Sequence, residues 1–304
     1  MESLGFSTRN IRRIDMLGGT EVTNHLLGIR NIVAIGNNQI TANHDMKAAP
    51  IGFMVNDDIQ NLTFEKNMVF KNLNRVVQIE AGNEYQYFKA PKLVSLNSID
   101  KDGVHNYKLI LKAQTSGSQY LYIPKIRLSG VSISVNGQMI PPIYSGLGTE
   151  VIPLGNIRAG HKFSVQITSP NSLTGVENDF AGLDNQAFNR DVVNRPISTL
   201  KFDKPKEINY QGDNFKGNIN VTQNNQTLFM SMPFDMGWHI EVNGKPGKVI
   251  KVADGLMGIK LHPGNNRLHF KYEAAGLKLG IVLSIATLVL VVITELVRVR
   301  RHKM

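Results

Sequence analysis

An uninterrupted apolar run close to the C-terminus constrains this chain more than any other feature. Residues Leu279–Thr294 carry no charged side chain, and apolar residues extend the run past Lys278 and Glu295. As a helix, residues 277–297 would be about 31 Å long, which matches the roughly 30 Å hydrocarbon core of a bilayer. A buried helix of a soluble protein is the weaker alternative, because no polar face recurs at helical spacing. The sequence therefore predicts one transmembrane helix over residues 274–298.

Basic residues follow the apolar run directly. They are Arg298, Arg300, Arg301 and Lys303, whereas Lys278 is the only cation in the last few positions before the run. By the positive-inside rule, the tail over residues 299–304 is expected in the cytoplasm and the bulk of the chain outside the cell. We expect this helix to hold the chain in the cell membrane, with the lipid bilayer as its partner. The expected anchoring residues are Lys278, Glu295, Arg298, Arg300 and Arg301.

The N-terminal residues do not supply the export signal that this topology requires. Residues 1–16 have charges scattered through them and no apolar stretch, unlike a signal peptide. Two interpretations remain open. Either further membrane helices belong upstream, or the chain is a tail-anchored cytosolic protein that breaks the positive-inside rule.

Composition excludes several classes of function. Taking Lys278, Glu295 and the four tail cations away from 34 Lys+Arg and 24 Asp+Glu leaves a net charge of +6 on residues 1–276. That charge is modest, and no basic stripe is interleaved with aromatic residues, so no nucleic-acid partner is expected. Because the chain has no cysteine, it has no disulfide, thiolate metal site or cysteine nucleophile.

Alternating strand patterns dominate from about residue 105, and they occur twice. Each copy contains a strand running toward a proline, an I-x-V-N-G hairpin (Ile133–Gly137 and Ile240–Gly244), and a closing strand led by glycine. Asn-Gly pairs favour the positive φ angles of tight hairpins. Asp102-Gly103 and Asp254-Gly255 are expected to form turns in the same way. The repeat predicts two related antiparallel β-sandwich modules.

The expected fold class is mainly β (α+β), with a jelly-roll-like character in the two modules. Helical spacing from Leu62 to Val76, and a short helix end before a buried strand near His25, predict that residues 1–90 are mixed α/β. The modules are then expected at residues 91–170 and 207–273. A polar connector over 171–206 joins them.

No set of residues predicts catalysis or metal binding, and no cofactor is expected. Adjacent Asp57 and Asp58 point in different directions on any regular element, so a solvated loop is favoured over an acid/base pair. His44-Asp45 lacks the spacing of a metal motif. Trp238, which follows Asp235, is the residue of most interest. It suits a sugar or lipid-interface contact, although a place in the sandwich core beneath the Asn243-Gly244 hairpin is the stronger alternative.

The C-terminal part also contains an ordered set of short motifs. A strand leads into P-F-D-M-G-W, and then come a V-N-G-K hairpin, a G-L-M-G-I strand, a glycine-led strand and a G-L-K-L-G entry into the apolar helix. The key positions are Pro233, Phe234, Asp235, Gly237, Trp238, Val242, Asn243, Gly244, Lys245, Gly255, Gly258, Gly264, Gly276 and Gly280. This order resembles the end of YfhO-type bacterial membrane proteins. Upstream, Leu26–Ala34 is similar to another segment of the family, with Asn31 where a tyrosine is usual.

This resemblance implies a polytopic glycosyltransferase of the GT-C type. Such proteins take a sugar from a polyprenyl-phosphate carrier and attach it outside the cell, in some members to lipoteichoic acid. Their acid/base carboxylates lie in exterior loops between early membrane helices, which this sequence lacks. The resemblance thus implies a non-catalytic exterior region with the last helix, either truncated or one piece of a split protein. The expected partners are the missing helices and a cell-envelope polysaccharide or teichoic acid. The alternative is a stand-alone membrane-anchored β-sandwich that binds carbohydrate or a protein.

Overall fold

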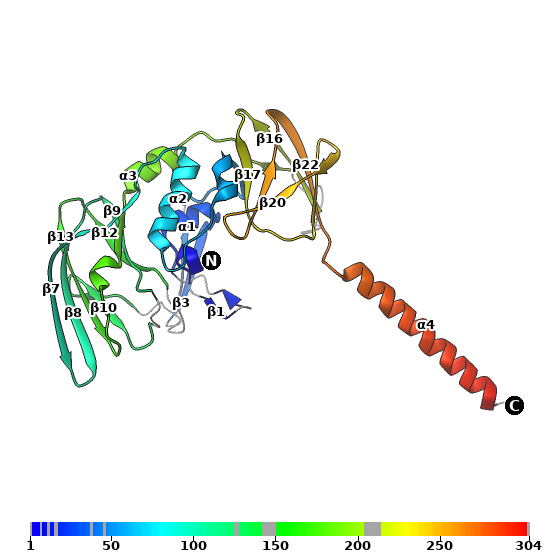
Figure 1. The fold of residues 1–304 in the computed structure, drawn as a ribbon, viewed down its shortest axis with the longest axis horizontal. Coiled ribbons are helices and arrows are strands. Elements are labelled where there is room, and N and C mark those ends of the chain that lie inside the picture. Colours follow the sequence, from blue (N-terminus) through cyan, green and yellow to red (C-terminus); the bar gives the residue numbers. More distant parts are fainter. Residues whose placement is uncertain are drawn as a thin grey trace.

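The computed structural model describes residues 2–6, 8–10, 13–14, 18–36, 39–44, 47–124, 128–141, 150–203 and 214–302. It is mainly β, with antiparallel sheets, a small helical region and one long C-terminal helix, which confirms the expected fold class. Figure 1 shows the helical region between two β-modules, with the long helix leaving from the second module.

The first β-module consists of two facing sheets. A five-stranded sheet has the order β11-β10-β13-β8-β7, and a four-stranded sheet has the order β12-β9-β14-β6. The strands are β6 (Phe88–Lys89), β7 (Lys92–Lys101), β8 (Val104–Lys112), β9 (Gly117–Leu121), β10 (Ser132–Val135), β11 (Gln138–Met139), β12 (Ile152–Ile157), β13 (Lys162–Ser169) and β14 (Phe180–Leu183). Alternate residues of β8 and β13 are buried between the sheets, as the period of two requires.

The second β-module also has two facing sheets, and its five-stranded sheet repeats the strand order of the first. Its sheets have the orders β19-β18-β22-β16-β15 and β20-β21-β17-β5. The strands are β5 (Gly52–Asn56), β15 (Lys201–Phe202), β16 (Asn214–Val221), β17 (Gln226–Pro233), β18 (Trp238–Val242), β19 (Lys245–Gly247), β20 (Val249–Val252), β21 (Leu256–Lys260) and β22 (Gly264–Tyr272).

The two Asn-Gly hairpins are equivalent in detail. Asn136 and Asn243 have φ values of 50° and 53°, and the glycine after each also has a positive φ. The amide side chain of Asn136 accepts a hydrogen bond from the Ser164 N–H at 2.9 Å, and that of Asn243 accepts one from the Arg267 N–H at 2.8 Å. This match aligns β10, β13 and β8 with β18, β22 and β16, residue by residue.

Each module is completed by a strand from outside the stretch that the repeat predicts. The first module recruits β14, which follows it in the chain, by pairing with β9. The second recruits β5 from the N-terminal region by pairing with β17. The connector likewise contains β14, β15, a helix α3 (Asn185–Phe188) and a π-helical turn (Asn189–Val193). It is therefore a structured part of both modules.

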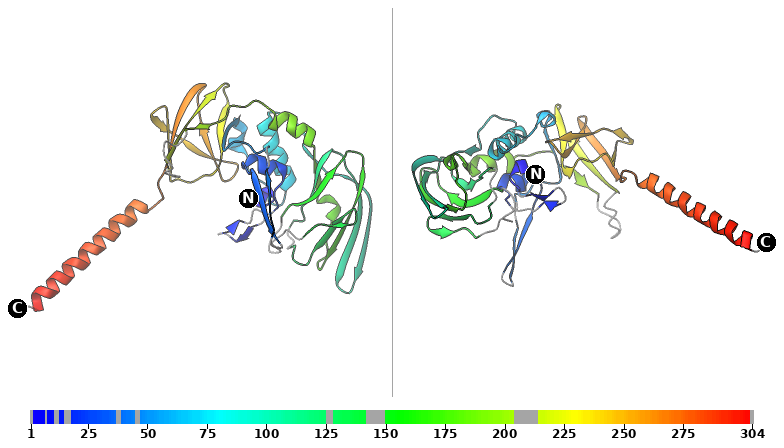
Figure 2. Two further views of the ribbon diagram at one scale, coloured as in Figure 1. Left: turned by 180° about the vertical axis from the view of Figure 1, so that it is seen from behind. Right: turned by 60° about the horizontal axis from the view of Figure 1, so that its bottom comes forward.

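The N-terminal region forms a helical layer between the modules. It contains α1 (Glu21–Leu26), α2 (Val69–Ala81), 3-10 turns at Glu2–Leu4 and Asp57–Asn61, and the pairs β1 (Thr8–Asn10) with β2 (Arg13–Ile14) and β3 (Asn31–Gly36) with β4 (Gln39–His44). Its core is continuous with residues of both modules, including Tyr120 and Leu183 from the first and Phe53 and Phe229 from the second. Figure 2 shows this layer between the modules from two further directions.

Glu21 ties the helical layer to the first module. Its carboxylate accepts hydrogen bonds from Ser118 at 2.5 Å, Asn185 at 2.8 Å and Lys47 at 2.9 Å. Burial alone would raise the pKa of Glu21, but these hydrogen bonds hold it below its usual value. The carboxylate therefore stays ionised at this junction.

Two local predictions differ from the structure. The helix predicted from Leu62 begins only at Val69 and continues to Ala81, because residues 62–68 form a loop in which Glu65 N–H donates to the Asn72 side chain. In the turn before β21 the positive φ angles belong to Ala253 and Asp254 rather than to Gly255. The Asp-Gly pair therefore predicts a turn here, but not which residues have the left-handed backbone.

The C-terminal helix α4 (Leu277–His302) is apolar over a span long enough to cross a membrane. None of this span is buried against the rest of the protein, and within the described residues it is the one helix of this kind. Exposed leucine, isoleucine and valine side chains cover it. A helix that is apolar on all sides and has no protein partner is typical of a membrane span.

Candidate functional site

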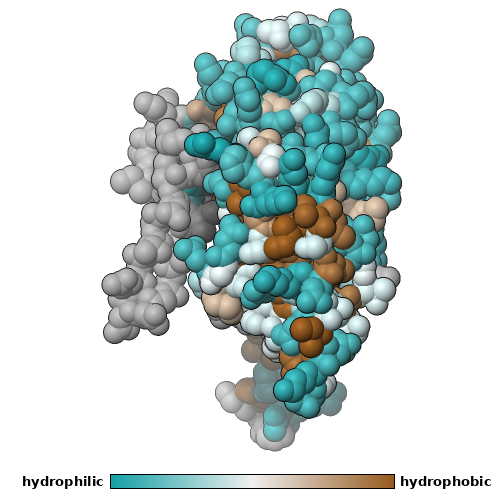
Figure 3. Space-filling view, turned by 90° about the vertical axis from the view of Figure 1, so that its left-hand side faces the viewer, coloured by the Kyte–Doolittle hydropathy of each residue, from teal (hydrophilic) through white to brown (hydrophobic). Residues whose placement is uncertain are grey.

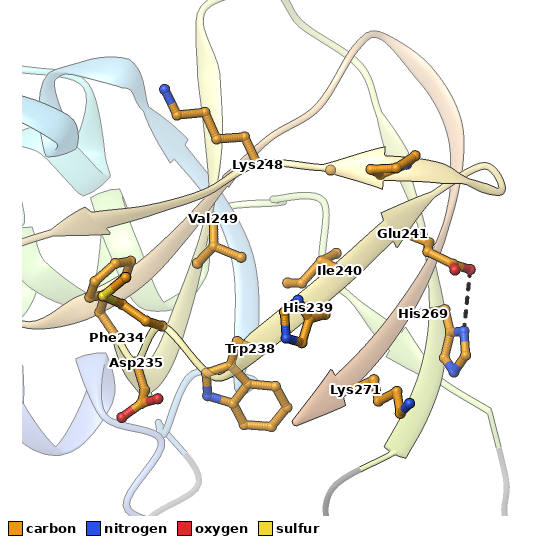
Figure 4. A pocket seen from close by; sticks show the side chains of 13 residues that line it. Phe234, Asp235, Trp238, His239, Ile240, Glu241, Lys248, Val249, His269 and Lys271 are labelled. Carbon is orange, nitrogen blue, oxygen red and sulfur yellow. Dashed lines mark hydrogen bonds and ion pairs between the residues drawn. The ribbon is translucent and has the colours of Figure 1, made fainter. Parts of the chain in front are cut away.

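A pocket of about 580 Å³ lies at one end of the second β-module. It is formed by the turn between β17 and β18, by β18 itself, by the start of β20 and by the last residues of β22 (Figure 4). Its lining side chains are Phe234, Asp235, Met236, Trp238, His239, Ile240, Glu241, Pro246, Lys248, Val249, His269 and Lys271. This open, concave surface combines an aromatic wall with several polar groups, and it is the candidate ligand site of the described chain.

Trp238 forms the aromatic wall of this pocket and is half-buried. Its ring packs against Phe215, with centroids 5.7 Å apart, and against Tyr272 at 5.0 Å. Trp238 is the first residue of β18, so it lies at the opposite end of that strand from the Asn243-Gly244 hairpin. It closes one end of the core of the second module and also faces the pocket.

Asp235 shapes the turn that presents Trp238. Its carboxylate accepts the Gly237 N–H at 2.7 Å, and its carbonyl accepts the Trp238 N–H at 3.2 Å. Gly237 is needed here because a Cβ at this position would lie 2.4 Å from the Glu273 carbonyl oxygen. The P-F-D-M-G-W motif therefore forms a tight turn against the end of β22. Asp235 stabilises this turn through its two hydrogen bonds.

The rim of the pocket mixes positive, negative and neutral polar groups. His269 contacts Glu241 at 3.4 Å and the Asn214 side chain at 2.7 Å, so its ring is held in place. His239 and Lys248 are exposed on the same rim. Hydroxyl groups are both donors and acceptors, so such a mixture suits a polyhydroxylated ligand better than a ligand of one charge.

Glu273 connects this end of the module to the membrane helix. Its carboxylate accepts from Lys271 at 2.8 Å and from Lys278, in the first turn of α4, at 2.6 Å. Hydrogen bonds from these two lysines lower the pKa of Glu273 from 4.5 to about 2. Its backbone N–H also donates to the Gly237 carbonyl at 2.9 Å. The pattern of apolar residues alone did not reveal this residue.

The other residues that the sequence predicts as anchors lie at the far end of α4. Glu295 and Arg298 form an ion pair at 3.5 Å. Arg300 and Arg301 lie in the last turn of the helix and are exposed. The helix thus continues through the residues that the sequence assigns to a separate tail, of which Lys303 lies outside the described residues.

A row of three lysines crosses the outer face of the first module. Lys112 of β8 lies directly opposite Lys92 of β7 on one side and Lys162 of β13 on the other. Like charges directly opposite in a sheet repel, and no ion pair with a carboxylate relieves this lysine row among the described residues. Figure 3 shows hydrophilic side chains on either side of a hydrophobic band at this end of the molecule. Val94 and Ile99 of the edge strand β7 are exposed apolar side chains.

The acidic residues weighed from the sequence are not brought together as a catalytic pair. Asp57 accepts from the Thr227 hydroxyl at 2.6 Å and from Gln60 at 2.9 Å, so it joins the 3-10 turn to β17 instead of lying free in a solvated loop. Asp45 lies outside the described residues. Within the described part of the chain, no group of three histidine or acidic side chains is placed to hold a metal ion.

Comparison with known proteins gives a family match over most of the chain. The model of the family described as "Bacterial membrane protein YfhO" matches residues 1–284. The "Uncharacterized protein YfhO" of Bacillus subtilis (strain 168) is 22% identical over 104 residues, which make up 34% of this chain and 12% of that protein. The aligned part of the chain is thus a small fraction of that relative.

Solved structures give only remote similarity. The arabinofuranosyltransferase AftD from Mycobacteria is 9% identical, with 80% of this chain and 28% of that chain covered and a TM-score of 0.21. A mutant form of that enzyme is 11% identical, with 52% and 13% covered and a TM-score of 0.22. A protein of unknown function from Pseudomonas aeruginosa PAO1 is 12% identical, with 59% and 82% covered and a TM-score of 0.18. These scores are too low to support a functional argument.

The identity of the chain therefore follows from the family match, and one feature of its own structure agrees with it. The match covers the helical layer, both modules and the start of α4. The exposed apolar helix is the element that a membrane protein requires. This chain belongs to the YfhO family of bacterial membrane proteins.

Proposed function

We propose that the chain is the extracytoplasmic C-terminal region and last membrane helix of a glycosyltransferase that uses a polyprenyl-phosphate sugar. In this role it holds carbohydrate near the membrane and does not supply the acid/base groups. The observation that carries the proposal is the Trp238 face in a polar-rimmed pocket beside the start of α4.

The chemistry of the pocket favours a sugar. An indole face packs well against the C–H face of a pyranose ring, and its N–H can donate to a hydroxyl. Asp235, Glu241 and His239 line the same pocket and offer polar groups around that face. Lys271 and Lys248 add positive charge to the rim, which favours a sugar that carries phosphate.

The lysine row favours an anionic polymer as the acceptor. Lys92, Lys112 and Lys162 are exposed on adjacent strands, and neighbouring strands are about 4.8 Å apart. Asn97, Asn106 and Gln166 add neutral hydrogen-bonding groups to the same face. A teichoic acid or an acidic cell-envelope polysaccharide has the matching charge and an extended shape.

The proposed orientation follows from charge. The cations at the end of α4 oppose translocation, so the tail would stay in the cytoplasm and both modules would lie outside. In intact cells that also supply the upstream part of the protein, added protease should remove the modules, while a tag after Met304 stays protected. Digestion of the tag with survival of the modules would reverse the orientation and contradict the exterior role.

The sugar contact can be tested directly, because Trp238 is the single tryptophan of the chain. The full chain in lipid nanodiscs is titrated with soluble oligosaccharides of envelope polymers, and tryptophan emission is followed. We expect a saturable change in emission and weaker binding by Trp238→Phe in calorimetry, with Tyr85→Phe as the matched aromatic control in the helical layer. A panel of oligosaccharides that leaves both emission and heat unchanged would contradict a sugar site.

The non-catalytic role has its own test. Purified by itself, the chain should transfer no sugar from a polyprenyl-phosphate donor, because the family resemblance places the acid/base carboxylates in exterior loops between early membrane helices. Transfer that disappears when a carboxylate within residues 1–276 is changed would place the chemistry in this chain. Sugar binding without transfer, even when the upstream helices are supplied, would favour a membrane-anchored binding module.

A further inference from the structure

The end of the second module next to α4 exposes apolar and aromatic side chains that no other part of the described chain covers. Met236, at the tip of the turn before β18, is 85% exposed, and Phe202 is 39% exposed. Trp238 and Tyr272 are half-buried beside them. We propose that this end, which we call the aromatic end (Phe202, Met236, Trp238 and Tyr272), rests in the headgroup layer of the bilayer that α4 crosses.

Chain length brings the aromatic end close to the membrane. Tyr272 is the last residue of β22, and α4 begins at Leu277. Even if fully extended, the five steps between them span at most about 17 Å. The actual link is shorter, because it turns with a hydrogen bond from Leu277 N–H to the Ala274 carbonyl at 3.1 Å. The headgroup layer is about 5–8 Å thick, so this link leaves at most about 12 Å between the end of the module and that layer.

A continuous set of contacts fixes which surface faces the lipid. Lys278 at the membrane end of α4 pairs with Glu273, and the Glu273 N–H donates to the carbonyl of Gly237. Gly237 lies between Met236 and Trp238. The turn that carries these two side chains is therefore attached to the point at which the chain enters the bilayer.

The residue types suit that depth. Tryptophan and tyrosine prefer the boundary between headgroups and acyl chains, where an apolar ring and a polar atom are both accommodated. Lys271 and Lys278 can reach lipid phosphates while they hold Glu273. An exposed methionine adds apolar contact area without charge.

The comparison with the first module supports lipid as the occupant. The hairpin alignment places Val131 and Ser169 where the second module has Trp238 and Tyr272, and both residues of the first module are buried. At these two positions the module that is joined to the membrane helix thus has large aromatic side chains, whereas the first module has a valine and a serine. In Figure 1 the first module lies at the far side of the molecule from α4.

The first experiment uses the single tryptophan in nanodiscs that contain lipids with a nitroxide at the headgroup, at a shallow acyl position or at a deep acyl position. We expect the headgroup and shallow nitroxides to quench Trp238 emission more than the deep one, and Met236→Ser to weaken that quenching. Met139→Ser, at another exposed methionine (64%) in the first module, should change nothing. Equal, background-level quenching by all three lipids would overturn the proposal.

The second experiment makes the result independent of Trp238. Because the chain has no cysteine, Met236→Cys and Met139→Cys each give one spin-label site. In nanodiscs, the label at position 236 should collide more with oxygen and less with a water-soluble nickel complex than the label at 139. Equal exposure of both labels to nickel contradicts the proposal. If the label at position 236 is protected from both reagents and shows dipolar broadening, two labels lie close together. The surface would then contact a second copy of the chain, and this result would also overturn the proposal.

Discussion

The two β-modules share the strand order of their five-stranded sheets and one type of hairpin, yet their surfaces differ at equivalent positions. Lys112 and Lys162, which lie opposite each other in the first module, correspond to Asn220 and Asn265 in the second. Conversely, the aromatic residues near α4 replace small or aliphatic ones. The inward-facing residues keep both sandwiches packed, so the outer faces and ends are free to differ in function.

The prediction with the largest expected effect tests whether the two modules unfold together. Phe53 of β5 is fully buried, and its ring packs 5.2 Å from that of Phe229 in the core of the helical layer. Phe53→Ala should lower the free energy of unfolding by about 3–5 kcal/mol, because it leaves a cavity there. Since that core contacts both modules, thermal unfolding should stay a single transition at a lower temperature.

Ile51→Ala, at a 48% exposed side chain just before β5, is the matched control and should change little. Two separate transitions in Phe53→Ala, only one of them shifted, would show instead that the modules unfold independently.

The second prediction concerns the turn that presents Trp238; the equivalent turn of the first module makes the same backbone hydrogen bond, from Val131 N–H to the Leu128 carbonyl, but presents a valine. Gly237→Ala places a methyl group against the Glu273 carbonyl and the Tyr272 ring. We expect a loss of about 1–3 kcal/mol from the overpacking, together with a change in Trp238 emission. The control is Gly255→Ala, because a Cβ there would meet no atom within 4 Å. Equal melting temperatures for the two variants would mean that the turn can open without cost.

The third prediction concerns how folding stability changes with pH. One carboxyl group in the first module and one at the end of the second should change it in opposite directions. Burial, followed by the charge of Glu177, raises the pKa of Asp179 beside β14 from 3.8 to about 7. The folded state therefore binds this proton more tightly, and stability should fall as pH rises from about 4 to about 7. Glu273, with its pKa lowered to about 2, should add stability above its ordinary pKa of 4.5 and lose it in acid.

Unfolding curves of the native chain and Asp179→Asn across this pH range provide the measurement. The variant should lose the decline between pH 4 and 7, by a modest amount because solvent screens a partly exposed carboxyl group. If the stability of the variant declines as much as that of the native chain, another residue causes the decline.

The smallest expected effect comes from exchanging surface residues between the modules. Lys112→Asn with Lys162→Asn gives the first module the residues of the second, and it should weaken binding of a linear polyphosphate probe in a salt-dependent way. Stability should stay equal or rise slightly, because like charges are removed. Lys216→Asn, at the place in the second module that corresponds to Lys108, is the control. Equal loss of binding in this control would show that the net charge matters and the lysine row does not.

Local patterns made the membrane helix and the repeat predictable. An apolar run and an Asn-Gly hairpin each specify their structure within a few residues. The recruitment of β5 and β14 was not predictable in this way, because the sequence of a short apolar strand does not specify the distant strand with which it pairs. The same holds for the pocket. Trp238 could be singled out as a candidate, but its contacts with Phe215 and Tyr272 come from strand pairings between distant segments.

The pairing of β5 with β17 has a consequence for how the chain is made. Asp57, just after β5, and its partner Thr227 are separated by 170 residues. At a synthesis rate of 5–20 residues per second, roughly 10–30 s pass between the appearance of these two segments. During that interval β5 has an open edge and an apolar side chain that awaits its partner, a state prone to misassembly. Folding of this region should therefore depend on a chaperone that protects β5 until β17 has been synthesised. The yield of folded protein should change with translation speed even where the stability of the folded protein does not.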